Sequence, residues 1–302
     1  MKHIKLAAVA AALIIWTGWQ NNTVGITHYT VLSDSLPAAF DQYKIAVVSD
    51  LHNGEYGENN CRLTSIIKKE SPDMIAVTGD FVDSKRTDMK IAEELIKRLT
   101  EIAPCYYVTG NHEAWIGGRY QELEEKLLDT GVIILHDRSV GLMKDNERIQ
   151  IAGLDDPDFT TGNLSEKESA LKNKIKGMKL TEDYCILLSH RPEYFRTYVS
   201  ESIDLVLSGH AHGGQFRLPF IGGLIAPGQG IFPKYDAGAY SENRTTMIVS
   251  RGIGNSIIPV RFNNRPEVVI VHLDAYSART AHPFQRNGAP FRFKLSKAQQ
   301  VD

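Results

Sequence analysis

The chain has 302 residues, of which 42% are hydrophobic and 23% charged, and its 34 Lys and Arg against 36 Asp and Glu give a formal net charge of −2. This length and composition fit one large α/β domain or two smaller ones, and they exclude a largely disordered chain. The near-neutral charge excludes a broad nucleic-acid-binding surface, so we expect no nucleic-acid partner. Three cysteines exclude a disulfide-built scaffold and a four-cysteine zinc site.

The first 20 residues have the layout of a secretory signal. Lys2 and Lys5 precede an apolar run from Leu6 to Trp19, and polar residues follow it. Small-residue cleavage patterns lie inside the run and not just after it, so we expect an uncleaved signal anchor over 1–20, with a removed signal peptide as the alternative. Lysines at the start of such an anchor stay cytoplasmic, which predicts a single-pass protein of the cell membrane whose remaining domain is extracytoplasmic.

Short apolar runs and helical patterns then alternate along the chain. In residues 21–43, a period-two pattern over 26–32 predicts an edge strand after a tether. From residue 44 the alternation predicts a largely parallel α/β sheet. Its expected strands are 45–48, 74–77, 106–108, 185–188 and 205–207, and its expected helices are 62–69, 89–99, 120–128 and 165–176. The strands expected over 149–153, 247–250 and 268–273 have little helix between them and indicate a second, mixed sheet.

The apolar periodicity ends near residue 275. We therefore expect the folded domain to cover 44–274 and a basic tail to cover 275–302. This tail carries five Lys or Arg residues against one acid, Asp302.

Side chains suited to metal binding follow each of the five strands of the first expected sheet. Loops at the carboxyl ends of strands are where open α/β folds place ligands, so these side chains should meet in one crevice. They are Asp50, His52, Asp80, Asn111, His190, His210 and His212. One such histidine is more often structural, whereas five strand ends carrying oxygen or imidazole groups indicate a metal site. Mixed carboxylate, amide and imidazole ligands favour Mn, Fe or Zn over Ca.

These residues resemble the five ordered motifs of the calcineurin-like metallophosphoesterases. The motifs are Asp50-x-His52, Gly79-Asp80-x-x-Asp83, Gly110-Asn111-His112-Glu113, His190 and Gly209-His210-Ala211-His212. The segments 213–220, 250–252 and 261–266 resemble the membrane-anchored bacterial branch of that superfamily, which includes enzymes acting on lipid-linked pyrophosphates. The resemblance implies two stacked mixed β-sheets flanked by helices, a four-layer α/β/β/α fold.

The resemblance also implies a dinuclear metal centre of two divalent or trivalent ions. The first ion would be held by Asp50, His52 and His212, the second by Asn111, His190 and His210, and Asp80 would bridge them. A hydroxide bridging the two ions would be the nucleophile, because two cations lower the pKa of bound water and clamp the phosphate.

His112 is left over from this ligand set. The resemblance makes it the proton donor to the leaving alkoxide, oriented by Asp83 through its other ring nitrogen. The alternative for Asp83 is an ordinary cap of the helix that begins near Asp88. Protein phosphatases of the superfamily have an arginine where this chain has Ser84, so phosphoprotein hydrolysis by their route is not expected.

The segment 216–233 follows the last expected ligands and combines apolar residues with glycine and proline, which predicts an irregular conformation. It could line the core as a crossover. Alternatively, it flanks the active site and dips towards the bilayer or towards acyl chains.

The sequence therefore predicts a metal-dependent phosphoesterase that hydrolyses a phosphodiester, pyrophosphate or phosphomonoester, with a lipid-linked substrate among the candidates. The membrane would be a partner through the N-terminus and the segment 216–233. One alternative is a secreted nucleotide phosphodiesterase, and another is an inactive, metal-bearing binding scaffold. The sequence gives no oligomeric state.

Overall fold

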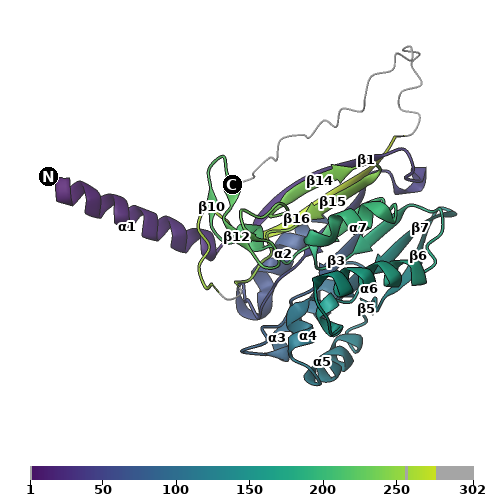
Figure 1. Cartoon of the computed structure of the whole chain (residues 1–302). Coiled ribbons are helices and arrows are strands. Elements are labelled where there is room, and N and C mark those ends of the chain that lie inside the picture. Colours follow the sequence, from purple (N-terminus) through teal and green to yellow (C-terminus); the bar gives the residue numbers. More distant parts are fainter. Residues whose placement is uncertain (1, 256–257, 277–302) are drawn as a thin grey trace, which may run out of the picture.

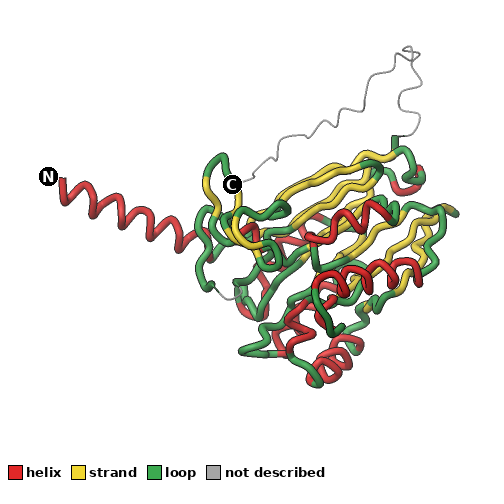
Figure 2. The backbone as a smooth tube through the Cα atoms, in the orientation of Figure 1, coloured by secondary structure: helices red, strands yellow, loops and turns green. Residues whose placement is uncertain are grey.

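Two mixed β-sheets lie face to face between two layers of helices (Figure 1), and Figure 2 shows the helices on the outside of the strands. The computed structural model describes residues 2–255 and 258–276. Each sheet has six strands. The α/β/β/α fold expected from the sequence is therefore confirmed.

The first sheet has the order β1-β16-β2-β3-β4-β5. Its strands are β1 (Gly25–Ser33), β16 (Glu267–Ala275), β2 (Tyr43–Val48), β3 (Met74–Thr78), β4 (Cys105–Val108) and β5 (Ile133–Ile134). The pairing of β16 with β2 is antiparallel, and the other pairings are parallel. The edge strand expected over 26–32 is thus observed as β1, which pairs with β16 from Gly25↔Glu267 to Ser33↔Ala275.

The second sheet has the order β14-β15-β9-β8-β7-β6. Its strands are β14 (Gly238–Glu242), β15 (Thr245–Val249), β9 (Leu205–Ser208), β8 (Cys185–Leu188), β7 (Glu147–Gly153) and β6 (Arg138–Lys144). The four central strands run parallel, and β14 and β6 pair antiparallel at the two edges.

Two details of the expected topology are wrong. The five strands assigned to one parallel sheet are divided, with β2, β3 and β4 in the first sheet and β8 and β9 in the second. Conversely, β16, expected in the second sheet, lies in the first. The reason is that an apolar run shows that a strand is buried on both faces, but it does not specify which neighbour pairs with it.

Three apolar layers hold these elements together. Between the sheets pack side chains such as Ile45, Val108, Leu188 and Leu207. The outer face of the first sheet is covered by α2 (Cys61–Glu70), α3 (Met89–Thr100) and α5 (Arg119–Leu128). The outer face of the second sheet is covered by α6 (Leu164–Gly177) and α7 (Phe195–Ser200).

The helix boundaries follow from local chemistry. Asp88 accepts a hydrogen bond from the Lys90 N–H and so caps α3, whose residues Leu95 and Leu99 are fully buried. Asn163 and Glu166 form a reciprocal capping box at the start of α6. Shorter elements are α4 (Asn111–Trp115) and the 3-10 turns Ala38–Phe40, Glu58–Asn60, Pro157–Phe159 (η3), Pro192–Tyr194 and His212–Gly214.

The N-terminal helix α1 (Lys2–Asn21) projects from the body of the domain (Figure 1). Among the described residues, none of the helices is both long enough and apolar enough to span a membrane. The segment expected to be irregular forms two small antiparallel hairpins beside the inner end of α1. They pair β10 (Arg217–Leu218) with β11 (Gly222–Gly223), and β12 (Ile225–Ala226) with β13 (Gly230–Ile231). Beyond Tyr276, the expected basic tail lies outside the described residues.

The core between the sheets gives a direct test of this packing. Leu207→Ala should lower the free energy of unfolding by about 2–5 kcal/mol, because it opens a cavity where two sheets meet. Leu32→Ala on the half-exposed edge strand β1 is the control and should change it by about 0.5 kcal/mol or less. Urea unfolding measures both, and equal losses would contradict the assigned core.

Candidate metal centre

All seven expected metal ligands lie where strands end, and all are buried. Asp50 and His52 follow β2, Asp80 follows β3, Asn111 begins α4 after β4, His190 follows β8, and His210 and His212 follow β9. None of their side chains is more than marginally exposed. The carboxyl ends of strands from both sheets therefore converge on one site.

The backbone at this site is held in an unusual conformation. Positive φ angles occur at Asp50, His52, Asp80, His210 and His212. Residues with a Cβ adopt this region rarely, and such strain is concentrated at functional sites. Close packing also requires glycine at position 209, because a Cβ there would lie 2.5 Å from Asp50 Oδ2.

One group of ligand atoms surrounds a first position. His52 Nε2 lies 3.0 Å from His212 Nε2, and Asp50 Oδ1 lies 3.4 Å from His212 Nε2. Asp80 Oδ2 completes this group at 3.6 Å from His52 Nε2.

A second group lies on the other side of Asp80. His190 Nε2 is 3.2 Å from Asn111 Oδ1 and 3.1 Å from His210 Nδ1. The same Asp80 Oδ2 atom lies 3.2 Å from His190 Nε2. One carboxylate oxygen thus faces both groups, as expected for a residue between two ions.

These distances fit metal coordination. Atoms bound to one ion at about 2.1 Å and 90–110° apart are separated by about 3.0–3.4 Å. Burial lowers the pKa of His52 to about 3 and those of His210 and His212 well below the usual value, so these rings are neutral and present nitrogen lone pairs. In neutral rings, nitrogens 3.0 Å apart can share one N–H···N hydrogen bond, and the same two nitrogens are close enough to bind one ion.

The carboxylates at the centre require compensating positive charge. Burial raises the pKa of Asp50 to about 6. Burial lowers the pKa of His190, but the Asp80 and Asp50 carboxylates outweigh it and raise that pKa to about 10. His190 Nδ1 lies 2.7 Å from the Thr78 carbonyl oxygen and donates to it, which leaves Nε2 directed at the cluster. A cation would supply the charge that a proton on His190 otherwise provides.

The structure brings His112 to the site, where its ring contacts the backbone of Ser84. A ring nitrogen of His112 lies within 4.8 Å of ligand atoms of His52 and Asp80. Its Nδ1 accepts from the Ser84 N–H at 3.0 Å. Asp83 Oδ1 accepts from the N–H groups of Lys85 and Arg86, and the expected pairing of Asp83 with His112 stays a prediction. The motif places Asp83 in the correct loop, but its short side chain folds back onto its own turn.

Sequence reasoning missed the role of Glu113. Its fully buried carboxylate accepts hydrogen bonds from the N–H groups of Gly110, Asp80, Phe81 and Val82 at 2.7–3.2 Å. It therefore ties the loop of Asp80 to the start of α4, where Asn111 and His112 lie. The sequence feature that could have indicated this role is the position of Glu113 next to His112 in the Gly110-Asn111-His112-Glu113 motif.

Two buried arginines were also missed. Arg191 directly follows His190, makes a bidentate ion pair with Asp156 at 2.6 and 2.9 Å, and places Nη1 3.1 Å from His210 Nε2. Arg261 is fully buried and places Nη2 3.3 Å from His212 Nδ1. Burial lowers the pKa of Arg261 to about 10, which leaves it charged at neutral pH. Both arginines add positive charge behind the ligands.

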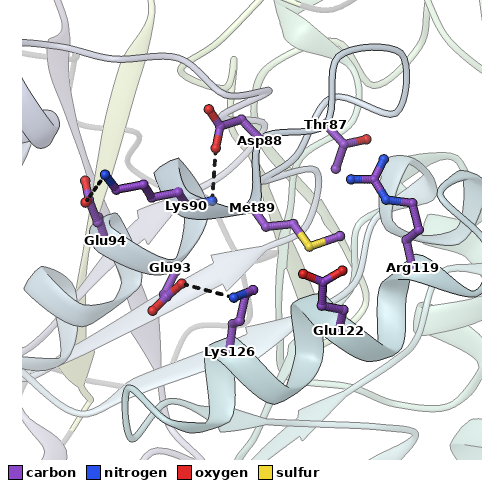
Figure 3. A pocket seen from close by; sticks show the side chains of 9 residues that line it. All are labelled: Thr87, Asp88, Met89, Lys90, Glu93, Glu94, Arg119, Glu122 and Lys126. Atoms are coloured by element: carbon purple, nitrogen blue, oxygen red, sulfur yellow. Dashed lines mark hydrogen bonds and ion pairs between the residues drawn. The ribbon is translucent and has the colours of Figure 1, made fainter.

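A separate surface hollow lies between α3 and α5 (Figure 3) and contains none of the expected site residues. Its charged side chains mostly neutralise one another, as in the pairs Lys90 with Glu94 and Lys126 with Glu93. The buried cluster at the strand ends is therefore the better candidate for the functional site.

Comparison with known proteins agrees with this geometry. The family model described as calcineurin-like phosphoesterase matches residues 43–214, which include all seven expected ligands. The uncharacterized metallophosphoesterase YkuE of Bacillus subtilis is 31% identical over 82% of this chain and 84% of its own length. The phosphodiesterase YaeI of Escherichia coli is 26% identical over 76% of this chain and 82% of its own length. A transmembrane protein with metallophosphoesterase domain from Danio rerio is 27% identical over 80% of this chain and 55% of its own length.

The family match covers the strands that carry the site, and the structure gathers the side chains of its motifs into three overlapping groups of possible metal ligands. The chain therefore belongs to the calcineurin-like phosphoesterases and is a metal-dependent hydrolase of phosphate esters.

Proposed function

We propose that the site holds two metal ions and hydrolyses a phosphodiester. The observation that carries this proposal is the single Asp80 oxygen between two histidine groups, at 3.6 Å from His52 Nε2 and 3.2 Å from His190 Nε2. Asp50, His52 and His212 would hold the first ion, and Asn111, His190 and His210 the second. The ligand types suit Mn, Fe or Zn.

Bound metals would supply positive charge for the phosphate and activate water for attack on phosphorus. In the overall reaction, the water oxygen forms a new bond to phosphorus, the bond to the leaving ester oxygen breaks, and the alcohol departs with a proton. We propose that His112 donates this proton to the leaving oxygen. Its Nδ1 accepts from the Ser84 N–H, so Nε2 is the nitrogen left to transfer the proton.

The charges around the site favour a diester over a monoester. Arg191, next to ligand His190, is neutralised by Asp156 and Asp158, and Arg261 is fully buried. Neither guanidinium faces solvent to bind the second negative charge of a monoester. A relative named as a phosphodiesterase supports the same choice. Pyrophosphates and monoesters remain comparison substrates.

Hydrolysis of bis-p-nitrophenyl phosphate tests the proposed function. The wild type should be active with Mn and inactive after chelation. Asp80→Asn and His112→Ala should each lower kcat by about 100-fold or more, because one loses the shared ligand and the other the proton donor.

Asp83→Asn is the matched control, because Asn can still accept from the N–H groups of Lys85 and Arg86. Its kcat should stay within about tenfold of wild type. A wild type that is inert with every metal would support the binding-scaffold alternative. A loss for Asp83→Asn equal to that for His112→Ala would support the expected dyad.

Glu113→Gln tests how the ligand loops are held. The substitution places an NH2 group against backbone N–H donors, so it should lower the free energy of unfolding by about 2 kcal/mol and reduce the bound metal per chain. Denaturant unfolding and metal analysis measure these effects. Glu122→Gln, on the exposed side of α5, should change neither. Full metal content in Glu113→Gln would contradict this role.

We further propose that the protein attaches to the extracytoplasmic face of the cell membrane and acts on a lipid-linked substrate. Large apolar side chains are exposed on α1 and on the two hairpins. They are Ile4, Leu13, Ile14, Ile15 and Trp19 on the helix, and Leu218, Phe220, Ile221, Ile225, Ile231 and Phe232 on the hairpins. A clustered set of this kind is typical of a membrane contact.

The helix and the hairpins are joined through one segment. Trp16 packs edge-on against Phe262, whose carbonyl accepts from the Arg217 N–H at the start of the hairpins. The hairpins also reach the site, because a Cβ at Gly228 would lie 3.7 Å from His210 Nε2. A lipid held at this surface would therefore lie beside the candidate metal centre. A relative named as a transmembrane protein supports a membrane location.

Vesicle sedimentation tests this attachment. The wild type should sediment with phospholipid vesicles, and the double variant Phe220→Ser and Phe232→Ser should bind at least about tenfold more weakly, because two exposed aromatic rings are lost. Met143→Ser, an exposed change on β6, should bind as wild type does. Wild-type protein that stays in the supernatant would contradict attachment and favour the secreted nucleotide phosphodiesterase.

Protease added outside intact cells tests the extracytoplasmic location of the domain. The protease should cleave the domain, and complete protection would contradict the proposed location.

A further inference from the structure

An exposed tryptophan stands next to the candidate proton donor. Trp115 is the last residue of α4, and 54% of its surface is exposed. Its ring lies beside that of His112, with centroids 4.9 Å apart and planes inclined by 40°. In Figure 1, α4 lies apart from α1 and from the hairpins that contain β10 and β12, so Trp115 is not part of the surface proposed to meet the membrane.

The indole of Trp115 is held in place by polar contacts. Its Nε1–H donates to Asp158 Oδ2 at 2.9 Å. Asp158, in the turn η3, is itself fixed, because Lys167 Nζ lies 2.6 Å from Oδ1 and Arg191 Nη2 lies 3.0 Å from Oδ2. Arg191 in turn places Nη1 3.1 Å from His210 Nε2. The indole is therefore positioned relative to both the proton donor and a candidate metal ligand.

Such an arrangement is unusual for a residue that only stabilises the fold. A tryptophan contributes most to stability when its ring is buried, and here about half of the ring faces solvent while its N–H is fixed. A flat apolar surface held rigid beside an acid suits a ring or hydrocarbon face of a ligand. Because His112 is assigned to protonate the departing alcohol, that alcohol is the part of the substrate nearest to Trp115.

We propose that Trp115 forms the leaving-group subsite, and that the substrate is a diester whose departing alcohol presents a planar or apolar face next to the ester oxygen. This inference rests on the proposed phosphodiesterase function. It concerns the choice of substrate, whereas the metal ligands and His112 concern the reaction itself.

Two diesters that share one leaving group test the assignment. Bis-p-nitrophenyl phosphate and methyl p-nitrophenyl phosphate both release p-nitrophenol but differ in the retained group. For Trp115→Ala, KM should rise about tenfold with both substrates, and kcat should change less than KM. Trp115→Phe keeps a flat ring and should stay within about threefold of wild type. Tyr276→Ala, an exposed aromatic change after β16, should leave both constants unchanged.

Each other outcome overturns the assignment. A rise in KM confined to the bis-aryl substrate would place Trp115 against the retained group. A fall in kcat at constant KM, with a shifted pH profile, would make Trp115 a positioning residue for His112. Unchanged constants would remove Trp115 from the site. A wild type inert towards all phosphate esters would instead contradict the proposed function.

A binding measurement tests, without substrate turnover, whether Trp115 contacts the apolar face of a diester. Of the three tryptophans, Trp16 and Trp19 lie on α1, so replacing both with Phe leaves Trp115 as the single reporter. Diphenyl phosphate should shift its fluorescence emission, and dimethyl phosphate should not. Equal responses to the two diesters would contradict a subsite that recognises apolar faces.

Discussion

The position of Asp80 is the constraint on which the rest of the structure depends. Its carboxylate is buried between two groups of imidazoles, with one oxygen facing both. Burying a carboxylate is costly unless hydrogen bonds and opposite charges compensate it. One oxygen, Oδ1, accepts from the backbone N–H of His112, and the other, Oδ2, faces the ligands. The two-sheet fold delivers the compensating groups, because strands from both sheets end around this residue.

A second layer of buried polar groups holds the ligand loops in place. Glu113 gathers backbone N–H groups from two loops of the first sheet, and Arg191 joins His190 and His210 of the second sheet to the acidic turn η3. These groups do not depend on an ion for their partners. The loops can therefore hold their residues with positive φ angles in position and present a preorganised set of ligands.

The same loops connect the site to the apolar edge of the molecule. The backbone of Arg261 exchanges two hydrogen bonds with the side chain of Asn21 at the end of α1, while its guanidinium lies against His212. Behind His212 the chain continues directly into the exposed hairpins. The projecting helix, the hairpins and the candidate metal centre are thus adjoining parts of one end of the fold.

The sequence alone determined the central strands, several of the helices and the strand-end residues that meet at the candidate site. Fully apolar runs identify β2, β3, β4, β8 and β9 because strands covered on both faces need apolar residues at every position, and the polar residues that end them mark the site. The sequence did not determine which strands share a sheet, because the apolar run that forms β16 does not specify the strands that pair with it. Nor did it show that Asp83 turns back onto Lys85 and Arg86, or that Glu113, Arg191, Arg261 and Trp115 surround the ligands. Those contacts join residues distant in sequence or depend on the direction of a single side chain, and only tertiary packing decides them.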